Sequence, residues 1–86
     1  MVHMKSNNLD ELIEYLLMID TKREMENFLH GLFTERELEE IPQRIQIVKM
    51  LKKGMPQREI AEELGIGVAT VTRGSTEIKK GRFRSI

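Results

Sequence analysis

The amino-acid sequence predicts an all-α protein of five to six helices with a helix-turn-helix unit near its C-terminal end. Apolar residues recur at helical spacing, and no Asn-Gly or Asp-Gly hairpin signal occurs among the 86 residues. The segment 57–73 reads as two short helices folded across a glycine turn. Because so short a chain buries a modest core, we expect a single domain, residues 1–86, that forms an intertwined homodimer. A compact monomer is the alternative.

The dimerisation helices are predicted over residues 8–53, after a disordered tail at residues 1–7. Leucine and isoleucine recur at helical spacing over residues 8–19, which predicts the first helix. The second helix is expected to begin at Thr21, which forms a capping-box pattern with Glu24. The leucine-rich face of these helices is the surface that a homodimer would bury.

A third, longer helix is expected to open at Thr34, which forms another capping box with Glu37. Pro42 lies inside its apolar pattern and has no N–H to bond to residue 38, so we expect a kink or a break there. Two lysines followed by Gly54 are typical of a helix C-terminus, because cations complement the dipole and glycine accepts a left-handed conformation.

The helix-turn-helix unit is predicted over residues 56–79. Ala61 lies where the two helices would cross, and Gly65 lies where the turn needs positive φ. A basic tail, residues 80–86, follows and is expected to fray. Four apolar side chains would fill the small core between the helices: Ile60, Leu64, Ile66 and Val71.

The net charge of zero hides an asymmetry between the two halves of the chain. Residues 1–43 carry four basic and ten acidic side chains, whereas residues 44–86 carry ten basic and four acidic ones. A basic half that contains a helix-turn-helix unit indicates a nucleic-acid-binding face. A solvated acidic surface balanced by the basic half is the plainer interpretation.

Several other classes of protein are not expected. The chain has no cysteine, which excludes disulfides and thiolate metal sites, and we expect no metal or resident cofactor. No apolar run has the length of a membrane span and no signal-peptide pattern is present, so we expect a cytoplasmic protein without a membrane partner. His3 and His30 lack an acid or metal-ligand partner at useful spacing, so no enzyme is expected.

Three blocks of residues between Phe33 and Lys79 carry a family resemblance. They are 44–48, 55–60 and, most specifically, Ala69-Thr70-Val71-Thr72-Arg73-Gly74-Ser75. In these blocks the chain resembles the tryptophan repressor family. The resemblance implies a sequence-specific repressor that binds double-stranded operator DNA as a homodimer. A small corepressor, L-tryptophan or a related amino acid, would set the angle of its reading helices.

Two alternatives stay open. The chain could be a DNA-binding regulator that answers to a different ligand or to none. It could also be a helical protein-interaction module that uses the same fold without DNA.

The resemblance also implies a corepressor pocket. Arg44 and Arg73 match the two arginines that sandwich the ligand ring in this family, and guanidinium suits both ring stacking and carboxylate binding. Backbone carbonyls at Gly31 and Phe33 of the partner chain would face the ligand ammonium. The other matching pocket positions are Thr34, Thr70, Gly74 and Glu77.

Glu77 departs from the family, which has a serine at this position. Its carboxylate could pair with the ligand ammonium, or it could change which ligand fits. It could also fold inward between Arg44 and Arg73 and take the place of a ligand carboxylate. The third arrangement would give a repressor that needs no corepressor.

The expected DNA contacts lie at the starts of the two helices of the unit and along the second helix. Small residues at Gly67, Val68 and Ala69 would let the second helix enter the major groove closely. Arg58 is the best candidate for a bidentate contact with guanine. Phosphate or water-bridged contacts are expected from Gln57, Thr72 and Lys79.

Overall fold

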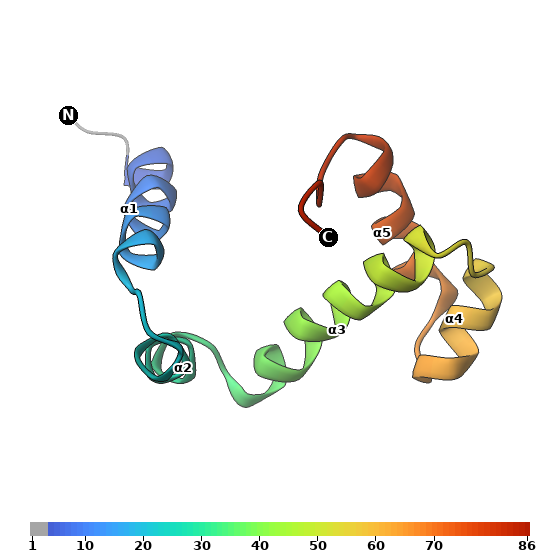
Figure 1. Cartoon of the computed structure of the whole chain (residues 1–86), viewed down its shortest axis with the longest axis horizontal. Helices are drawn as coiled ribbons and strands as arrows, with labels where there is room; N and C mark the ends of the chain where they lie inside the picture. The colour runs from blue at the N-terminus through green and yellow to red at the C-terminus, as the bar shows by residue number, and fades with distance from the viewer. Residues whose placement is uncertain (1–3) are drawn as a thin grey trace. The chain divides into compact units, whose positions relative to one another are not determined.

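The computed structural model describes residues 4–86, and its regular elements in that range are all helices (Figure 1). The all-α prediction is therefore confirmed. The predicted tail at residues 1–7 is wrong for its second half, because the first helix already begins at Met4, and residues 1–3 lie outside the described part. In chain order the helices are α1 (Met4–Met18), α2 (Lys22–Leu32), α3 (Glu35–Lys52), α4 (Gln57–Leu64) and α5 (Val68–Lys79).

The chain divides into two compact units, Met1–Leu38 and Glu39–Ile86, and the boundary falls inside α3. Of the kink or break expected at Pro42, the break does not occur, since α3 continues through the proline to Lys52. Proline removes one backbone hydrogen bond, and the helix continues on both sides of it.

The N-terminal unit consists of amphipathic helices without a core of their own. Thr21 caps α2 by accepting a hydrogen bond of 3.1 Å from the backbone N–H of Glu24. None of the side chains described in residues 7–38 is buried. Large apolar side chains are instead exposed along these helices: Leu9, Ile13, Leu17, Met18 and Leu32.

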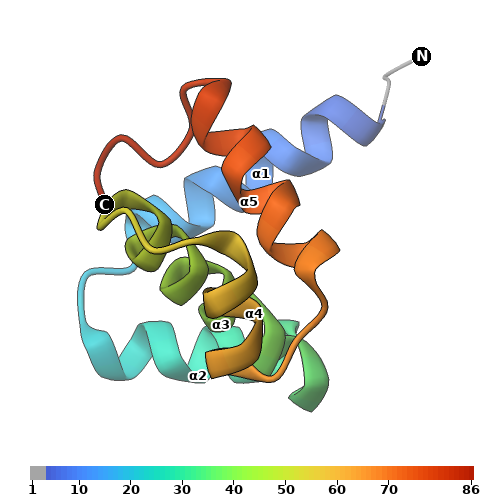
Figure 2. The same cartoon turned by 90° about the vertical axis from the view of Figure 1, so that its right-hand side faces the viewer.

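The C-terminal unit holds the buried core, with α4 and α5 packed against the later turns of α3 (Figures 1 and 2). Ile60 and Val71 are fully buried there, as the sequence predicts. Ile47 of α3 is 2% exposed and joins them, so the core also includes the long helix. The partly buried side chains around it are Met50, Leu51, Met55, Leu64 and Ile66.

Candidate nucleic-acid interface and ligand pocket

A tight turn joins α4 to α5 and sets the angle between them. Gly65 has φ 66° and ψ 40°, the left-handed conformation that glycine accepts without steric cost. The N–H of Ile66 donates to the carbonyl of Ala61 at 3.0 Å, and the N–H of Gly65 donates to Glu62 at 3.3 Å. This pair of bonds is a Schellman motif. Ala61 is buried at the crossing, so the predicted turn chemistry is confirmed.

The N-terminus of α5 is open to solvent. Gly67 is the N-cap residue, and no side chain caps the helix there. Gly67, Val68 and Ala69 are all exposed, as a helix end that approaches DNA requires. The first-turn N–H groups carry the positive end of the helix dipole, so they can approach a phosphate or a base edge closely.

Two of the residues expected to contact DNA contact each other. The hydroxyl of Thr72 on α5 lies 2.6 Å from Oε1 of Gln57 at the start of α4, and also 3.0 Å from the carbonyl of Val68. With its oxygen engaged, the Gln57 amide keeps its two N–H donors free for an outside partner. The sequence did not reveal this bond, which ties the two helices of the unit together. Arg58 and Lys79 are exposed on the same unit.

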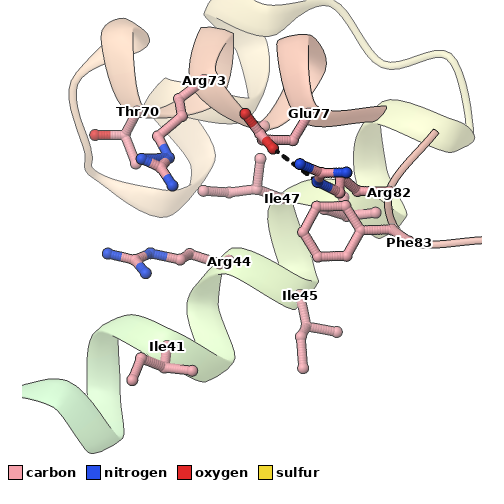
Figure 3. A pocket seen from close by; sticks show the side chains of 11 residues that line it. Ile41, Arg44, Ile45, Ile47, Thr70, Arg73, Glu77, Arg82 and Phe83 are labelled. Atoms are coloured by element: carbon pink, nitrogen blue, oxygen red, sulfur yellow. Dashed lines mark ion pairs between the residues drawn. The ribbon is translucent and has the colours of Figure 1, made fainter. Parts of the chain in front are cut away.

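A pocket of about 570 Å³ lies between α3, α5 and the segment after α5 (Figure 3). Arg44 comes from α3 and Arg73 from α5, and their guanidinium groups lie one above the other on one side of the pocket. Neither arginine has a hydrogen bond or ion pair with any residue in the described range, so both can take a ligand anion. The apolar part of the lining consists of Ile41, Ile45, Ile47, Val48 and Phe83.

Glu77 lines the same pocket, and both of its carboxylate oxygens have a cationic partner. Oε2 lies 3.3 Å from Nζ of Lys80, and Oε1 lies 3.4 Å from Nε of Arg82. The hydrogen bond from Lys80 holds the pKa of the Glu77 carboxyl below its usual range. Partial burial opposes this shift, and the charges of Lys80, Arg82 and Arg73 reinforce it. Glu77 is therefore ionised at neutral pH, and it pairs with Lys80 and Arg82 rather than with Arg44 or Arg73.

The segment after α5 is folded against the pocket, so the expectation of a frayed tail at residues 80–86 is wrong. Gly81 has φ 92°, and the N–H of Arg82 turns back to the carbonyl of Glu77 at 3.1 Å. Nζ of Lys52 on α3 donates to the carbonyls of Phe83 and Ile86. These bonds place Arg82 and Phe83 on the pocket wall, and the sequence did not predict either residue there.

A sequence signal for this fold-back was present. Ile78-Lys79-Lys80-Gly81 repeats the pattern Leu51-Lys52-Lys53-Gly54, which ends α3. The N–H groups of Gly81 and Arg82 bond to Ile78 and Glu77, the same Schellman geometry as at the α4–α5 turn.

Five of the six residues assigned to the corepressor site line this pocket: Arg44, Thr70, Arg73, Gly74 and Glu77. Thr34 belongs to the N-terminal unit and does not line the pocket within this chain. Its hydroxyl accepts from the N–H of Glu37 at 3.1 Å, and its own N–H donates to the Glu37 carboxylate at 2.9 Å. Thr34 therefore caps α3, as the capping-box pattern predicts.

The described residues contain no cluster of histidine and acidic side chains that could hold a metal ion. Within the same part of the chain, no helix combines the length and apolar character needed to cross a membrane.

The second helix of the helix-turn-helix unit is exposed, and an arginine-lined pocket lies beside it. These features are typical of helix-turn-helix regulatory proteins. The sequence model of the family described as Trp repressor protein matches residues 7–84. The chain belongs to this family, whose members are non-enzymatic transcriptional regulators.

Curated relatives give the same result. The chain is 37% identical over 70 residues to the Trp operon repressor homolog of Vibrio campbellii, covering 80% of this chain and 70% of the relative. It is 38% identical over 78 residues to the homolog of Haemophilus influenzae, covering 86% and 77%. The homolog of Vibrio vulnificus is 42% identical over 59 residues, covering 67% and 58%.

Proposed function

We propose that this protein is a cytoplasmic, sequence-specific repressor that binds double-stranded operator DNA as a homodimer. A small ligand in the pocket between α3 and α5 would set the angle at which α5 meets the DNA. In the family resemblance this ligand is L-tryptophan or a related amino acid.

The exposed N-terminus of α5 carries the DNA-binding part of the proposal. No side chain caps its first turn, and Gln57 and Arg58 lie at the start of the adjacent helix α4. Glycine and small residues at the helix end allow close approach to a groove, and arginine can read guanine there. A protein-interaction module would not need an uncapped helix end flanked by an arginine and free amide donors.

The proximity of the pocket to α5 supports regulation by a ligand. Arg73 and Gly74 belong to α5 and also line the pocket, so a ligand held there contacts the reading helix directly. A difference in ligand affinity between two α5 orientations is what couples binding to DNA affinity. The pairing of Glu77 with Lys80 and Arg82, rather than with Arg44 and Arg73, supports a pocket whose two arginines are left for a ligand.

Selection of binding sites from a random duplex library tests the proposal. We expect a palindromic site to be enriched. On that site Arg58→Ala should cost about 1–3 kcal/mol and relax selectivity at one position of each half-site. Lys79→Ala should weaken binding to all sequences alike and reduce the salt dependence, as loss of a phosphate contact does.

Arg23→Ala is the matched control, since it removes an exposed arginine from α2. Failure to enrich any sequence would refute sequence-specific recognition. A loss from Arg58→Ala that is equal on all operator variants would assign Arg58 to the phosphate contacts.

A further inference from the structure

The side chains of Gln57 and Thr72 meet on the surface of the helix-turn-helix unit, outside the ligand pocket. Gln57 is the first residue of α4, and Thr72 lies in the second turn of α5. Ile60, which follows Gln57 by three residues, is fully buried, and so is Val71, which precedes Thr72. The backbone positions that carry the two polar side chains are therefore anchored in the core.

The Thr72 hydroxyl has one proton and two acceptors within reach. Oε1 of Gln57 lies at 2.6 Å, and the carbonyl of Val68 lies at 3.0 Å. The Val68 carbonyl stands four residues before Thr72 in α5, so it also accepts the helical bond from the Thr72 backbone N–H. The amide oxygen is closer and has no other donor among the described residues, so the hydroxyl proton belongs to the bond between the helices.

The bond with Thr72 determines what Gln57 offers to a partner outside the protein. A bidentate contact with adenine needs both the oxygen and the nitrogen of a glutamine amide, and here the oxygen is engaged. The two N–H donors that remain match a phosphate oxygen, which only accepts. No side chain caps α4 at Pro56, so the positive end of its dipole lies beside the amide and favours an anion there.

Gln57 differs in this respect from its neighbour Arg58. Arg58 is exposed and has no hydrogen bond or ion pair with any described residue, whereas Gln57 is half-buried and bonded to α5. A free glutamine side chain loses rotamer entropy when it binds DNA, and this loss weakens binding. A side chain that Thr72 already holds loses less. Thr72 can therefore raise DNA affinity without a DNA contact of its own.

We propose that Thr72 is a positioning residue for DNA binding. Its hydroxyl holds the Gln57 amide so that an amide N–H donates to a phosphate oxygen of the DNA backbone. Thr72 thus acts on DNA affinity through Gln57, in place of the independent phosphate contact that its exposed position on α5 suggests. This role rests on the proposed binding of DNA by the helix-turn-helix unit.

A double-mutant cycle on the operator obtained by site selection tests whether Thr72 acts through Gln57. Thr72→Val keeps the shape of the side chain without the hydroxyl, and Gln57→Met keeps the length without the N–H donors. Each should weaken binding about fivefold per half-site, the effect of one hydrogen bond. The double variant should bind no more weakly than Gln57→Met alone. Losses that multiply would show that Thr72 contacts DNA independently and would overturn the inference.

Thr76→Val is the matched control for Thr72→Val. The Thr76 hydroxyl bonds back to the Thr72 carbonyl at 3.1 Å within α5 and has no bond to α4. Its removal should leave DNA affinity unchanged. Thr72→Ser restores the hydroxyl and should bind about as tightly as the wild type. If Thr76→Val weakens binding as much as Thr72→Val does, the effect belongs to α5 itself and the inference is overturned.

Neutral methylphosphonates, placed at one phosphate of the operator at a time, separate a phosphate contact from a structural role. In the wild type, one such position in each half-site should weaken binding about fivefold through loss of the Gln57 bond. That loss should be absent in Gln57→Met and in Thr72→Val, and present in Thr76→Val. If Gln57→Met and Thr72→Val retain every loss seen with the wild type, the bond only supports the fold, which overturns the inference.

Nuclear magnetic resonance relaxation of the Gln57 side-chain amide gives a readout without DNA. The amide should be ordered in the wild type and in Thr72→Ser, and mobile in Thr72→Val. Equal mobility in all three proteins would overturn the inference, whatever the protein binds.

Failure of the inference is distinguishable from failure of the proposed function. Phosphate contacts need no particular sequence, so the double-mutant cycle can also be measured on a random duplex. A protein that selects no operator but shows the expected cycle on random DNA refutes the sequence-specific repressor and supports the role of Thr72. A protein that selects an operator but shows losses that multiply does the reverse.

Discussion

Gly74 shows how one residue serves both packing and the pocket. It lies on α5, where a Cβ atom would stand 3.1 Å from Cγ2 of Ile47 and 3.5 Å from Cδ1 of Leu51. The absence of a side chain therefore lets α5 approach α3, and this approach brings Arg73 to the same cavity as Arg44. The family resemblance assigned Gly74 to the ligand, and its packing role is visible in the structure alone.

Gly74→Ala should lower the free energy of unfolding by about 1 kcal/mol. Overpacking costs about 1–3 kcal/mol of stability. The higher helix propensity of alanine offsets at most about 1 kcal/mol of this cost. Ile47 is buried in the core and has little room to move away. Urea denaturation measures the change.

Gly31→Ala is the control for that measurement, because Gly31 lies in α2 with no heavy atom within 4 Å of the added Cβ. It should stabilise the protein slightly, by up to about 1 kcal/mol. If Gly74→Ala stabilises the protein as Gly31→Ala does, the close approach of α5 to α3 is not constrained by Gly74.

At the scale of the elements, local capping chemistry explains where α2 and α3 begin and where α3, α4 and α5 end. Thr21 and Thr34 cap α2 and α3 through hydroxyl bonds to backbone N–H groups. Glycines in left-handed conformation follow α3, α4 and α5. At Pro42, where a local rule predicted a kink or a break, the helix is not broken and continues to Lys52.

Thr34→Ala should reduce stability by about 1 kcal/mol, since it removes the N-cap of α3. Thermal unfolding followed by circular dichroism measures the loss. Thr76→Ala is the matched control, because the Thr76 hydroxyl bonds back to the Thr72 carbonyl inside a helix and should matter little. Equal effects of the two substitutions would contradict a capping role for Thr34.

At the scale of the whole molecule, the main feature is the exposed apolar surface of the N-terminal unit. Leu17 and Met18 of α1 are 79% and 74% exposed, and no side chain described in residues 7–38 is buried. Exposed apolar helices of this kind are typical of an interface. Because the family implies dimerisation, a second copy of the chain is the partner that we expect.

Leu17→Glu should therefore shift the protein toward the monomer, as seen by sedimentation equilibrium, because a charge at a buried interface position is costly. Asn8→Glu adds the same charge to an exposed position of the same helix and serves as the control. A wild-type protein that sediments as a monomer at micromolar concentration would contradict the dimer.

The sequence by itself determined the helices, the turn at Gly65 and the family, because these depend on local spacing, capping residues and short motifs. It also identified five of the pocket residues through the resemblance. The tertiary structure alone decided the partners of Glu77, the bond between Gln57 and Thr72, and the fold-back of Arg82 and Phe83. These depend on where side chains from different elements meet, and hydrophobic periodicity carries no information about that. These contacts between elements therefore determine the charges that line the pocket.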